Sequence, residues 1–192
     1  MVNLHSTDNV SGLFQNHPEY FQYFKGQLIP SSEIKQHTFT EQRVAIIGTN
    51  QHTVTALESI CQVAQSVYVF QNAPQFILPK TERGIQRLIQ HPLVIKNRRL
   101  FNTRIKCLLA LRFLETQVQD PWLRHQLKPN SAADKLKFFK SDHYYHALQR
   151  DNCKLITWPI VKIREHDIQS LDRKSTRLNS SHSRASRMPS SA

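Results

Sequence analysis

Long apolar runs are missing from this sequence. No stretch approaches the roughly 18–20 consecutive apolar residues that a membrane-spanning helix needs, and the mean hydropathy is −0.50. The first residues also lack a basic patch followed by an apolar core, the pattern of a secretory signal. We therefore expect a cytoplasmic protein. Its 192 residues suffice for one principal domain with a sizeable core.

Cysteines and recognisable catalytic groupings are equally scarce. Cys61, Cys107 and Cys153 are far apart and odd in number, so they predict neither a disulfide framework nor a metal site and favour a reducing compartment. Ten histidines are scattered, and His143 and His146 have no acidic or cysteine partner at metal-ligand spacing. A P-loop, a nucleophilic serine elbow and paired carboxylates are all missing. An independent hydrolase is therefore disfavoured.

Acidic residues are few, 14 against 26 Lys and Arg, which gives a formal net charge of +12. Such a charge favours a nucleic-acid partner, but part of it lies in residues 172–192. This segment begins DRKSTRLNSSH and resembles translated sequencing-adapter read-through. It contains five Lys or Arg and one Asp, a net +4, so the rest of the chain has +8. We expect a disordered, adapter-derived tail; the alternative is a genuine basic tail that binds nucleic acid.

The most informative stretch runs from Arg43 to Pro79. The apolar run VAII at 44–47 is typical of a strand buried on both faces of a parallel sheet, and Gly48 ends it before a polar turn at 49–52. From Thr53 the apolar residues recur at helical spacing, and a second apolar run follows at 67–70. This order predicts a βαβ unit of an α/β, Rossmann-like fold with a parallel sheet.

The flanking regions have weaker patterns. Residues 24–34 suggest a tight turn into a brief strand, and two prolines at 74 and 79 suggest an extended loop. Residues 81–127 have a basic helical pattern with breaks near Pro92 and Pro121. We expect its basic residues to face solvent; they are Arg98, Arg99, Arg104, Lys106 and Arg112. A helix capped by Ser141 and one strand from 154 continuing past Pro159 to 163 complete the prediction.

Four stretches in this order resemble class B flavoprotein monooxygenases, the flavin-containing and Baeyer–Villiger type. FKGQLIPSSEI at 24–34 is similar to the family's Phe-x-Gly-x-x-x-His fingerprint, although Pro30 stands where the histidine is found. VAIIGTNQHTVTA at 44–56 occupies the place of the NADPH-binding glycine loop. VFQNAPQFILP at 69–79 and the segment at 141–163 resemble the end of the second strand and the return towards the flavin domain.

The resemblance implies an internal fragment that covers the NAD(P)H-binding domain. Residues 1–42 would be a remnant of the FAD-domain segment and a linker, and 43–150 the NAD(P)H-binding domain with a helical insertion at about 81–127. Residues 151–171 would be a strand that returns towards an absent FAD domain. The family's first GxGxxG does not occur before residue 43, so we do not expect this chain to hold FAD tightly.

The glycine loop departs from GxGxxG at two positions. Gly48 takes the first glycine's place, while Asn50 and Thr53 stand at the second and third. Asn tolerates positive φ, but its side chain would crowd a pyrophosphate, and Thr53 could cap the helix while spacing it from the sheet. The helix N-terminus still favours anions. A Rossmann-like unit that has lost its nucleotide affinity is the alternative.

The resemblance assigns the remaining site residues. Asn72 replaces the arginine that contacts the NADPH 2′-phosphate, and Lys80 or Arg83 could substitute for it. The family's catalytic arginine, which stabilises an anionic oxygenated flavin, corresponds to Lys137; an ordinary solvated lysine is the alternative. The cofactor-binding residues implied are Gly48, Thr49, Asn50, Gln51, His52, Thr53, Gln71 and Asn72.

The expected function is the NAD(P)H-binding part of an FAD-dependent monooxygenase, inactive as this fragment. In the intact protein NADPH would reduce FAD, and a ketone or soft nucleophile would be oxygenated. We expect NADP and FAD as cofactors, a small organic substrate, no metal and no nucleic acid. The alternatives are a nucleotide-binding module of another flavoprotein NAD(P)H oxidoreductase and a basic nucleic-acid-binding protein.

Overall fold

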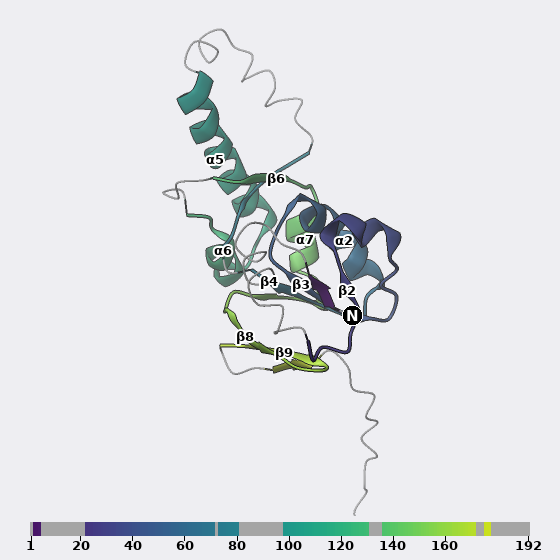
Figure 1. The fold of residues 1–192 in the computed structure, drawn as a ribbon. Coiled ribbons are helices and arrows are strands. Elements are labelled where there is room, and N and C mark those ends of the chain that lie inside the picture. The colour runs from purple at the N-terminus through teal and green to yellow at the C-terminus, as the bar shows by residue number, and fades with distance from the viewer. Residues whose placement is uncertain are drawn as a thin grey trace, which may run out of the picture.

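The computed structural model describes residues 2–4, 22–71, 73–80, 98–130, 136–171 and 175–177, with the backbone alone for 2–4, 98–102 and 175–177. The core is a parallel sheet with helices packed against it (Figure 1). Its strands run in the order β2-β1-β3-β4-β7. They are β1 (Val2–Leu4), β2 (Leu28–Ile29), β3 (Arg43–Ile47), β4 (Ser66–Phe70) and β7 (Cys153–Ile156). The α/β fold class and the brief strand at 28–29 are confirmed.

The predicted βαβ unit is confirmed. β3 and β4 are parallel neighbours in register from Arg43↔Ser66 to Ile47↔Phe70, and helix α2 (Gln51–Val63) connects them. Four consecutive residues of β3, from 44 to 47, are buried because the sheet has apolar side chains packed on both faces. One face packs on the α2 stripe of Val54, Leu57, Ile60 and Cys61.

The predicted extended loop at 74–79 contains a strand, so that prediction is wrong. β5 (Phe76–Leu78) pairs in parallel with β6 (Phe138–Lys140) as a separate two-stranded sheet. The two prolines lie outside the three apolar residues, so neither removes a ladder hydrogen bond within the strand. All three β5 residues are buried, and the rings of Phe76 and Phe138 stack with centroids 5.2 Å apart.

Two helices of the predicted insertion lie within the described residues. α5 (Arg98–Gln117) projects from the body, and α6 (Pro121–Leu127) lies at its base (Figure 1). The predicted break near Pro121 is confirmed: Asp120 is the N-cap of α6 and accepts from the Trp122 N–H at 2.9 Å. The predicted break near Pro92 lies outside the described residues.

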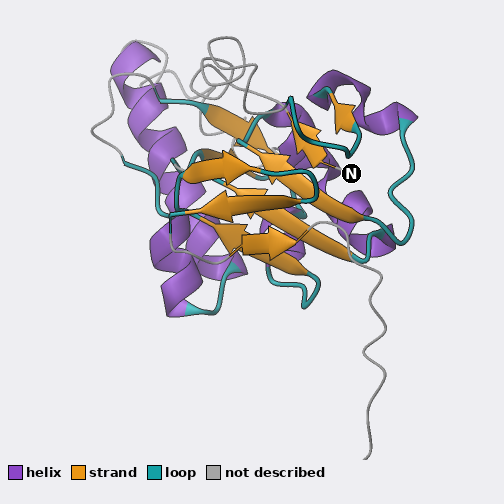
Figure 2. Cartoon of the chain, turned by 60° about the horizontal axis from the view of Figure 1, so that its bottom comes forward, coloured by secondary structure: helices purple, strands orange, loops and turns teal. Residues whose placement is uncertain are grey.

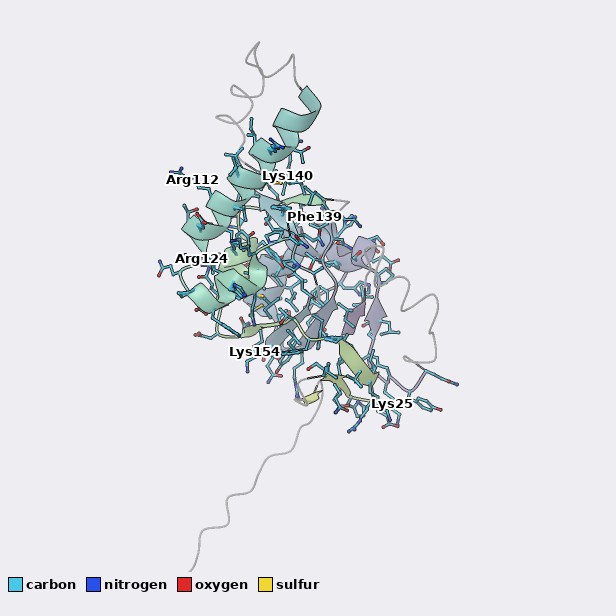
Figure 3. The ribbon with its side chains drawn as sticks, turned by 90° about the vertical axis from the view of Figure 1, so that its left-hand side faces the viewer. Lys25, Arg112, Arg124, Phe139, Lys140 and Lys154 are labelled. Atoms are coloured by element: carbon cyan, nitrogen blue, oxygen red, sulfur yellow. The ribbon has the colours of Figure 1, made fainter. Side chains whose placement is uncertain are left out.

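The basic residues of α5 are largely solvent-facing. Arg104 and Arg112 are exposed and Lys106 is half-buried, and Figure 3 shows Arg112 projecting away from the body. The side chains of Arg98 and Arg99 lie outside the described residues. The opposite side of α5 packs Ala110 against β5, so α5 and β5 have a common apolar contact.

Helix α7 is shorter than predicted. It comprises Tyr144–Leu148, and His143 rather than Ser141 occupies the N-cap position, without a side-chain cap. Ser141 is still local to the turn, because its Oγ accepts from the His143 N–H at 3.3 Å. Tyr144 and Tyr145 at the start of α7 are almost fully buried, and this burial positions the helix against α2.

The strand predicted from 154 to 163 is two separate strands rather than one continuous strand. β7 joins the main sheet beside β4, whereas β8 (Ile160–Ile163) pairs antiparallel with β9 (Asp167–Ser170). Pro159 accounts for the break because it cannot donate to a ladder. Lys25 is tied to the β8–β9 connection by a 3.1 Å ion pair with Glu165 (Figure 3).

The segment predicted to be a disordered, adapter-derived tail includes three described residues, 175–177. Residues 175–177 form β10 (Ser175–Arg177), which pairs antiparallel with β9. An open strand edge offers unpaired N–H and C=O groups to any extended segment, so a weakly patterned sequence can pair there. The strands of this small sheet lie in front of the main sheet in Figure 2. No helix among the described residues is long and apolar enough to cross a bilayer.

Candidate nucleotide site

The predicted loop lies where the parallel strands β3 and β4 end and α2 begins. The Gly48 N–H donates to the Phe70 carbonyl at 2.8 Å, and the Gln71 N–H donates to the Ile156 carbonyl at 2.9 Å. The carboxyl ends of β3, β4 and β7 are therefore joined side by side. In open parallel sheets this edge is where ligands bind, so the fold places the loop at the expected position.

Gly48 adopts the backbone conformation for which a glycine is needed. Its φ is 80°, a region that side chains with a Cβ avoid at a cost of roughly 1–2 kcal/mol. This residue lets the chain turn sharply from β3 towards α2. The role predicted for the first glycine of the loop is thus physically available.

Asn50 does not need the positive φ that an asparagine tolerates. Its φ is −136° and it is the N-cap of α2, so the helix begins at Gln51 and the predicted polar turn ends two residues early. The Asn50 Oδ1 accepts from the Thr53 N–H at 2.9 Å, and the Thr53 Oγ1 accepts from the Asn50 N–H at 2.9 Å. The two residues that replace glycines therefore form a reciprocal capping box.

The Asn50 side chain is directed into the protein. Its Nδ2 donates to the Ser31 Oγ at 2.9 Å, and both Asn50 and Ser31 are buried. Ser31 begins the 3₁₀ helix η2 (Ser31–Gln36), so Asn50 fastens η2 to the start of α2. From the sequence we expect this side chain to crowd a pyrophosphate, whereas in the structure it points towards Ser31.

The capping box changes what the helix can offer to an anion. The first N–H groups of any α-helix have no partner within the helix and form its positive end. In α2 the Thr53 N–H is already used by Asn50, while Gln51 and His52 in the first turn are exposed. An anion would therefore meet the N–H groups of Gln51 and His52 first.

Gln51 connects the loop to a distant strand. Its Nε2 donates to the Lys140 carbonyl at 2.9 Å, and its Oε1 accepts from the Lys140 N–H at 2.9 Å. This pair reproduces the two-bond pattern of strand pairing with a side-chain amide. β6 is thereby held beside the first turn of α2 (Lys140 is labelled in Figure 3).

Gln71 and Tyr144 form a buried polar contact beneath the loop. The Tyr144 Oη donates to the Gln71 Oε1 at 3.0 Å, and both residues are buried. Burial raises the pKa of Tyr144 far above its ordinary value, and a hydrogen bond from Thr49 opposes the rise. Tyr144 stays a neutral hydrogen-bond donor. Its role was not predicted, since the sequence shows no spacing that links residues 49, 71 and 144.

The remaining predicted site residues are Asn72, Lys80, Arg83 and Lys137. Asn72 and Arg83 lie outside the described residues. The Lys80 N–H donates to Asp142 Oδ1 at 2.8 Å. Lys137 is half-buried just before β6, and its carbonyl accepts from the Phe76 N–H at 3.3 Å. Within the described residues, no group of three or more His, Cys, Asp or Glu side chains could hold a metal ion.

Comparison with known proteins confirms the resemblance to flavoprotein monooxygenases. The chain is 27% identical over 157 residues to a Baeyer–Villiger monooxygenase of Pseudomonas aeruginosa and 25% identical over 153 residues to one of Streptomyces coelicolor. It is 24% identical over 198 residues to an FAD-binding monooxygenase of Aspergillus niger. These alignments cover 70%, 68% and 89% of this chain. The chain spans about 30% of the length of these curated relatives, and no protein-family model matches it.

Solved structures show the same fold. A steroid monooxygenase bound to NADP superposes with a TM-score of 0.56 over 73% of this chain and 38% of that protein, at 19% identity. An open form of cyclohexanone monooxygenase superposes with a TM-score of 0.59 over 81% of this chain and 42% of that protein, at 13% identity. At such identities the likeness establishes the fold alone.

Proposed function

We propose that residues 43–150 are the NAD(P)H-binding domain of an FAD-dependent monooxygenase. The observation that supports it best is the loop at the carboxyl edge of the parallel sheet, in which Gly48 turns at φ 80° into the N-terminus of α2. The resemblance to Baeyer–Villiger monooxygenases and a structural neighbour bound to NADP support the same assignment. With about 30% of its relatives' length, this chain would not complete a catalytic cycle alone.

The loop residues fit a pyrophosphate, although the loop retains one of the usual three glycines. Gly48 supplies the tight turn, and the N–H groups of Gln51 and His52 at the positive end of α2 supply donors to an anion. The Asn50 side chain is turned inward to Ser31, so it would not itself crowd a pyrophosphate at the loop. The Thr53 N–H is not available to a ligand, because it already donates to the Asn50 Oδ1.

When bound, NADPH would supply a hydride to FAD, whose reduced form activates oxygen for transfer to a ketone or soft nucleophile. The chain's own contribution is to orient the nucleotide. Gln51 holds β6 beside the loop, and the Tyr144–Gln71 contact keeps the end of β4 rigid beneath it. Lys137 remains a proposed source of positive charge near the flavin, and Asn72 and Lys80 remain proposed contacts to the adenosine half.

The test is NADPH and NADH binding to the full chain by titration calorimetry. Saturable one-to-one binding supports the proposal, and a folded chain that binds neither nucleotide overturns it. His52→Asp places a negative charge at the helix N-terminus, where it favours the helix but repels a pyrophosphate. We expect it to weaken NADPH binding about tenfold, the effect of roughly 1.4 kcal/mol.

Gln62→Glu is the matched control, because it adds the same charge to the far end of the same helix. It should leave NADPH affinity within about twofold, given that surface charges beyond a Debye length of roughly 8–10 Å are screened. Equal losses in both variants would mean that binding responds to net charge alone. That result would favour non-specific anion binding over a nucleotide site.

A further inference from the structure

Two cysteines that are 92 positions apart in the sequence meet in the fold. Cys61 lies in the last turn of α2, and Cys153 is the first residue of β7. Both are free thiols, buried at 1% and 7% exposure, and both belong to the same apolar core cluster. Cys107, on α5, is apart from this pair and half-buried.

The backbones on either side of the pair are held together by one residue. The Asn152 Nδ2 donates to the carbonyls of Cys61 at 2.8 Å and Ala64 at 3.0 Å. The Asn152 carbonyl in turn accepts from the Val67 N–H at 2.7 Å. The end of α2 and the start of β7 are thus fixed relative to each other independently of the thiols.

Charged groups lie beside the thiols. Arg150 pairs with Glu58 at 3.2 Å, and Glu58 sits one turn before Cys61 on α2. The hydrogen bond from Cys153 lowers the pKa of Cys61, and the same bond together with burial raises the pKa of Cys153. Within the pair, Cys61 is therefore the thiol that ionises first, and the thiolate is the nucleophilic form.

We propose that Cys61 and Cys153 are a redox-active dithiol, which a hydroperoxide oxidises to an intramolecular disulfide between α2 and β7. The Cys61 thiolate attacks one peroxide oxygen, the O–O bond breaks, and Cys61 becomes a sulfenic acid while the other oxygen leaves as water after protonation. Cys153 then attacks the Cys61 sulfur, loses its proton and displaces the second water. Two thiols lose two electrons in total, and hydrogen peroxide becomes two molecules of water.

Access to the pair is through the edge of the sheet. β7 is the terminal strand in the order β2-β1-β3-β4-β7, and the turn before it is closed by the Cys153 N–H to Arg150 carbonyl bond at 3.0 Å. Opening of such a turn needs far less free energy than global unfolding. A molecule as small as hydrogen peroxide can then reach Cys61, which is why oxidation is expected without loss of the fold.

The experiment treats the full chain with hydrogen peroxide, alkylates the remaining thiols under denaturing conditions, and maps the peptides by mass spectrometry. We expect one alkylated cysteine, Cys107, and a Cys61–Cys153 disulfide that dithiothreitol reverses. The oxidised chain should melt several degrees higher, because the crosslink closes a long loop in the unfolded state. Cys107→Ser should form the same disulfide, whereas Cys61→Ser and Cys153→Ser should not.

Full alkylation of Cys61 and Cys153 after peroxide treatment of the folded chain would overturn the proposal. So would their conversion to sulfinic or sulfonic acid without a disulfide, or a crosslink between two chains through Cys107. The mapping uses the unsubstituted chain, so it decides the matter even if Cys61→Ser or Cys153→Ser fails to fold. The result is independent of NADPH binding, and the two proposals can fail separately.

Discussion

Asn50 and Thr53 show how two substitutions can preserve a turn while changing its chemistry. At the second and third glycine positions of the GxGxxG pattern, which serve ligand approach and helix–strand packing, the chain has two side chains that bond each other's N–H groups. The helix start is stabilised by a residue pair whose usual contribution is about 1 kcal/mol. The same bonds use a donor that would otherwise face an anion.

Replacement of Asn50 should therefore separate stability from binding. Asn50→Ala should lower the free energy of unfolding by about 2 kcal/mol, because it removes both the cap and the buried bond to Ser31, and Asn50→Gly by about 1 kcal/mol, because glycine is itself tolerated at an N-cap. Asn50→Gly also frees the Thr53 N–H, so we expect NADPH affinity to rise several-fold. Urea denaturation and titration calorimetry measure the two effects.

The matched control is Asp120, which is likewise a side-chain N-cap, at the start of α6. Asp120→Ala removes this cap and should lower the free energy of unfolding by about 1 kcal/mol, with NADPH affinity unchanged. Weaker nucleotide binding in Asn50→Gly, with the fold intact, would show that the Asn50 side chain itself supports the ligand.

The buried tyrosines predict sensitivity to alkali. Burial raises the pKa values of both Tyr144 and Tyr145 above the ordinary 10.0. Their stabilising contribution is complete below pH 10, and it is lost as the pH rises beyond 10 because the unfolded chain ionises first. Two such groups make the free energy of unfolding fall by about 2.7 kcal/mol per pH unit there.

Tyr145→Phe should reduce that slope by about half, or roughly 1.4 kcal/mol per pH unit. Urea denaturation at a series of alkaline pH values gives the slope, and absorbance of tyrosinate gives the ionisation. If tyrosinate from residues 144 and 145 appeared while the chain remained folded, the expected linkage would be contradicted.

At the scale of elements, the contact between α2 and β6 depends on one side-chain amide. Gln51→Ala removes both hydrogen bonds to Lys140, and because the contact is exposed we expect a loss of only about 1 kcal/mol in the free energy of unfolding. The Lys140 amide should then exchange its hydrogen much faster. Hydrogen exchange followed by NMR or mass spectrometry measures this change.

The neighbouring Ser141 amide is the internal reference, since it donates to the Leu78 carbonyl at 2.9 Å and should keep its protection in Gln51→Ala. Gln62→Ala is the matched variant on the same helix, where the side chain makes a 3.4 Å bond to Glu58. It should leave the Lys140 amide protected. If the Lys140 amide were equally protected in the unsubstituted chain, in Gln51→Ala and in Gln62→Ala, the pairing with β5 alone would hold β6 in place.

How far the sequence predicts these elements depends on the range of the interactions. The βαβ unit was predictable because VAII, the α2 stripe and the run at 67–70 each carry a local period. β5 was missed because Pro74 and Pro79 dominate a short window, while the pairing that makes it a strand involves residues 62 positions away. Ser141 was a reasonable cap by type, but the burial of Tyr144 and Tyr145 determines where α7 begins.

The candidate site was predictable only as a segment. Gly48 and the helix start follow from the pattern, whereas the Ser31–Asn50, Gln51–Lys140 and Gln71–Tyr144 contacts join residues 19, 89 and 73 positions apart. A single sequence has no local signal for such pairs. The same reason hid the Cys61–Cys153 contact, since spacing alone suggested three unrelated thiols.

At the scale of the whole molecule, we predict that this chain purifies without flavin. The described residues supply one glycine-turn loop, at Gly48, and the proposed function assigns it to NAD(P)H. Flavin absorbance after purification, and fluorescence titration with added FAD, measure this. We expect a colourless chain and affinity at least about a hundredfold below that for NADPH, a difference of roughly 2.7 kcal/mol. Stoichiometric flavin in the purified chain would contradict the domain assignment.

The pairing of β7 with β4 has a kinetic consequence. β4 ends at Phe70 and its parallel neighbour β7 begins at Cys153, so 82 residues, from 71 to 152, separate the two strands in the sequence. Closing that loop costs conformational entropy before the hydrogen bonds between β4 and β7 can form. Such non-local pairing slows folding. The edge of the sheet that contains Cys153 should therefore be among the last parts to form, and the β3–α2–β4 unit among the first.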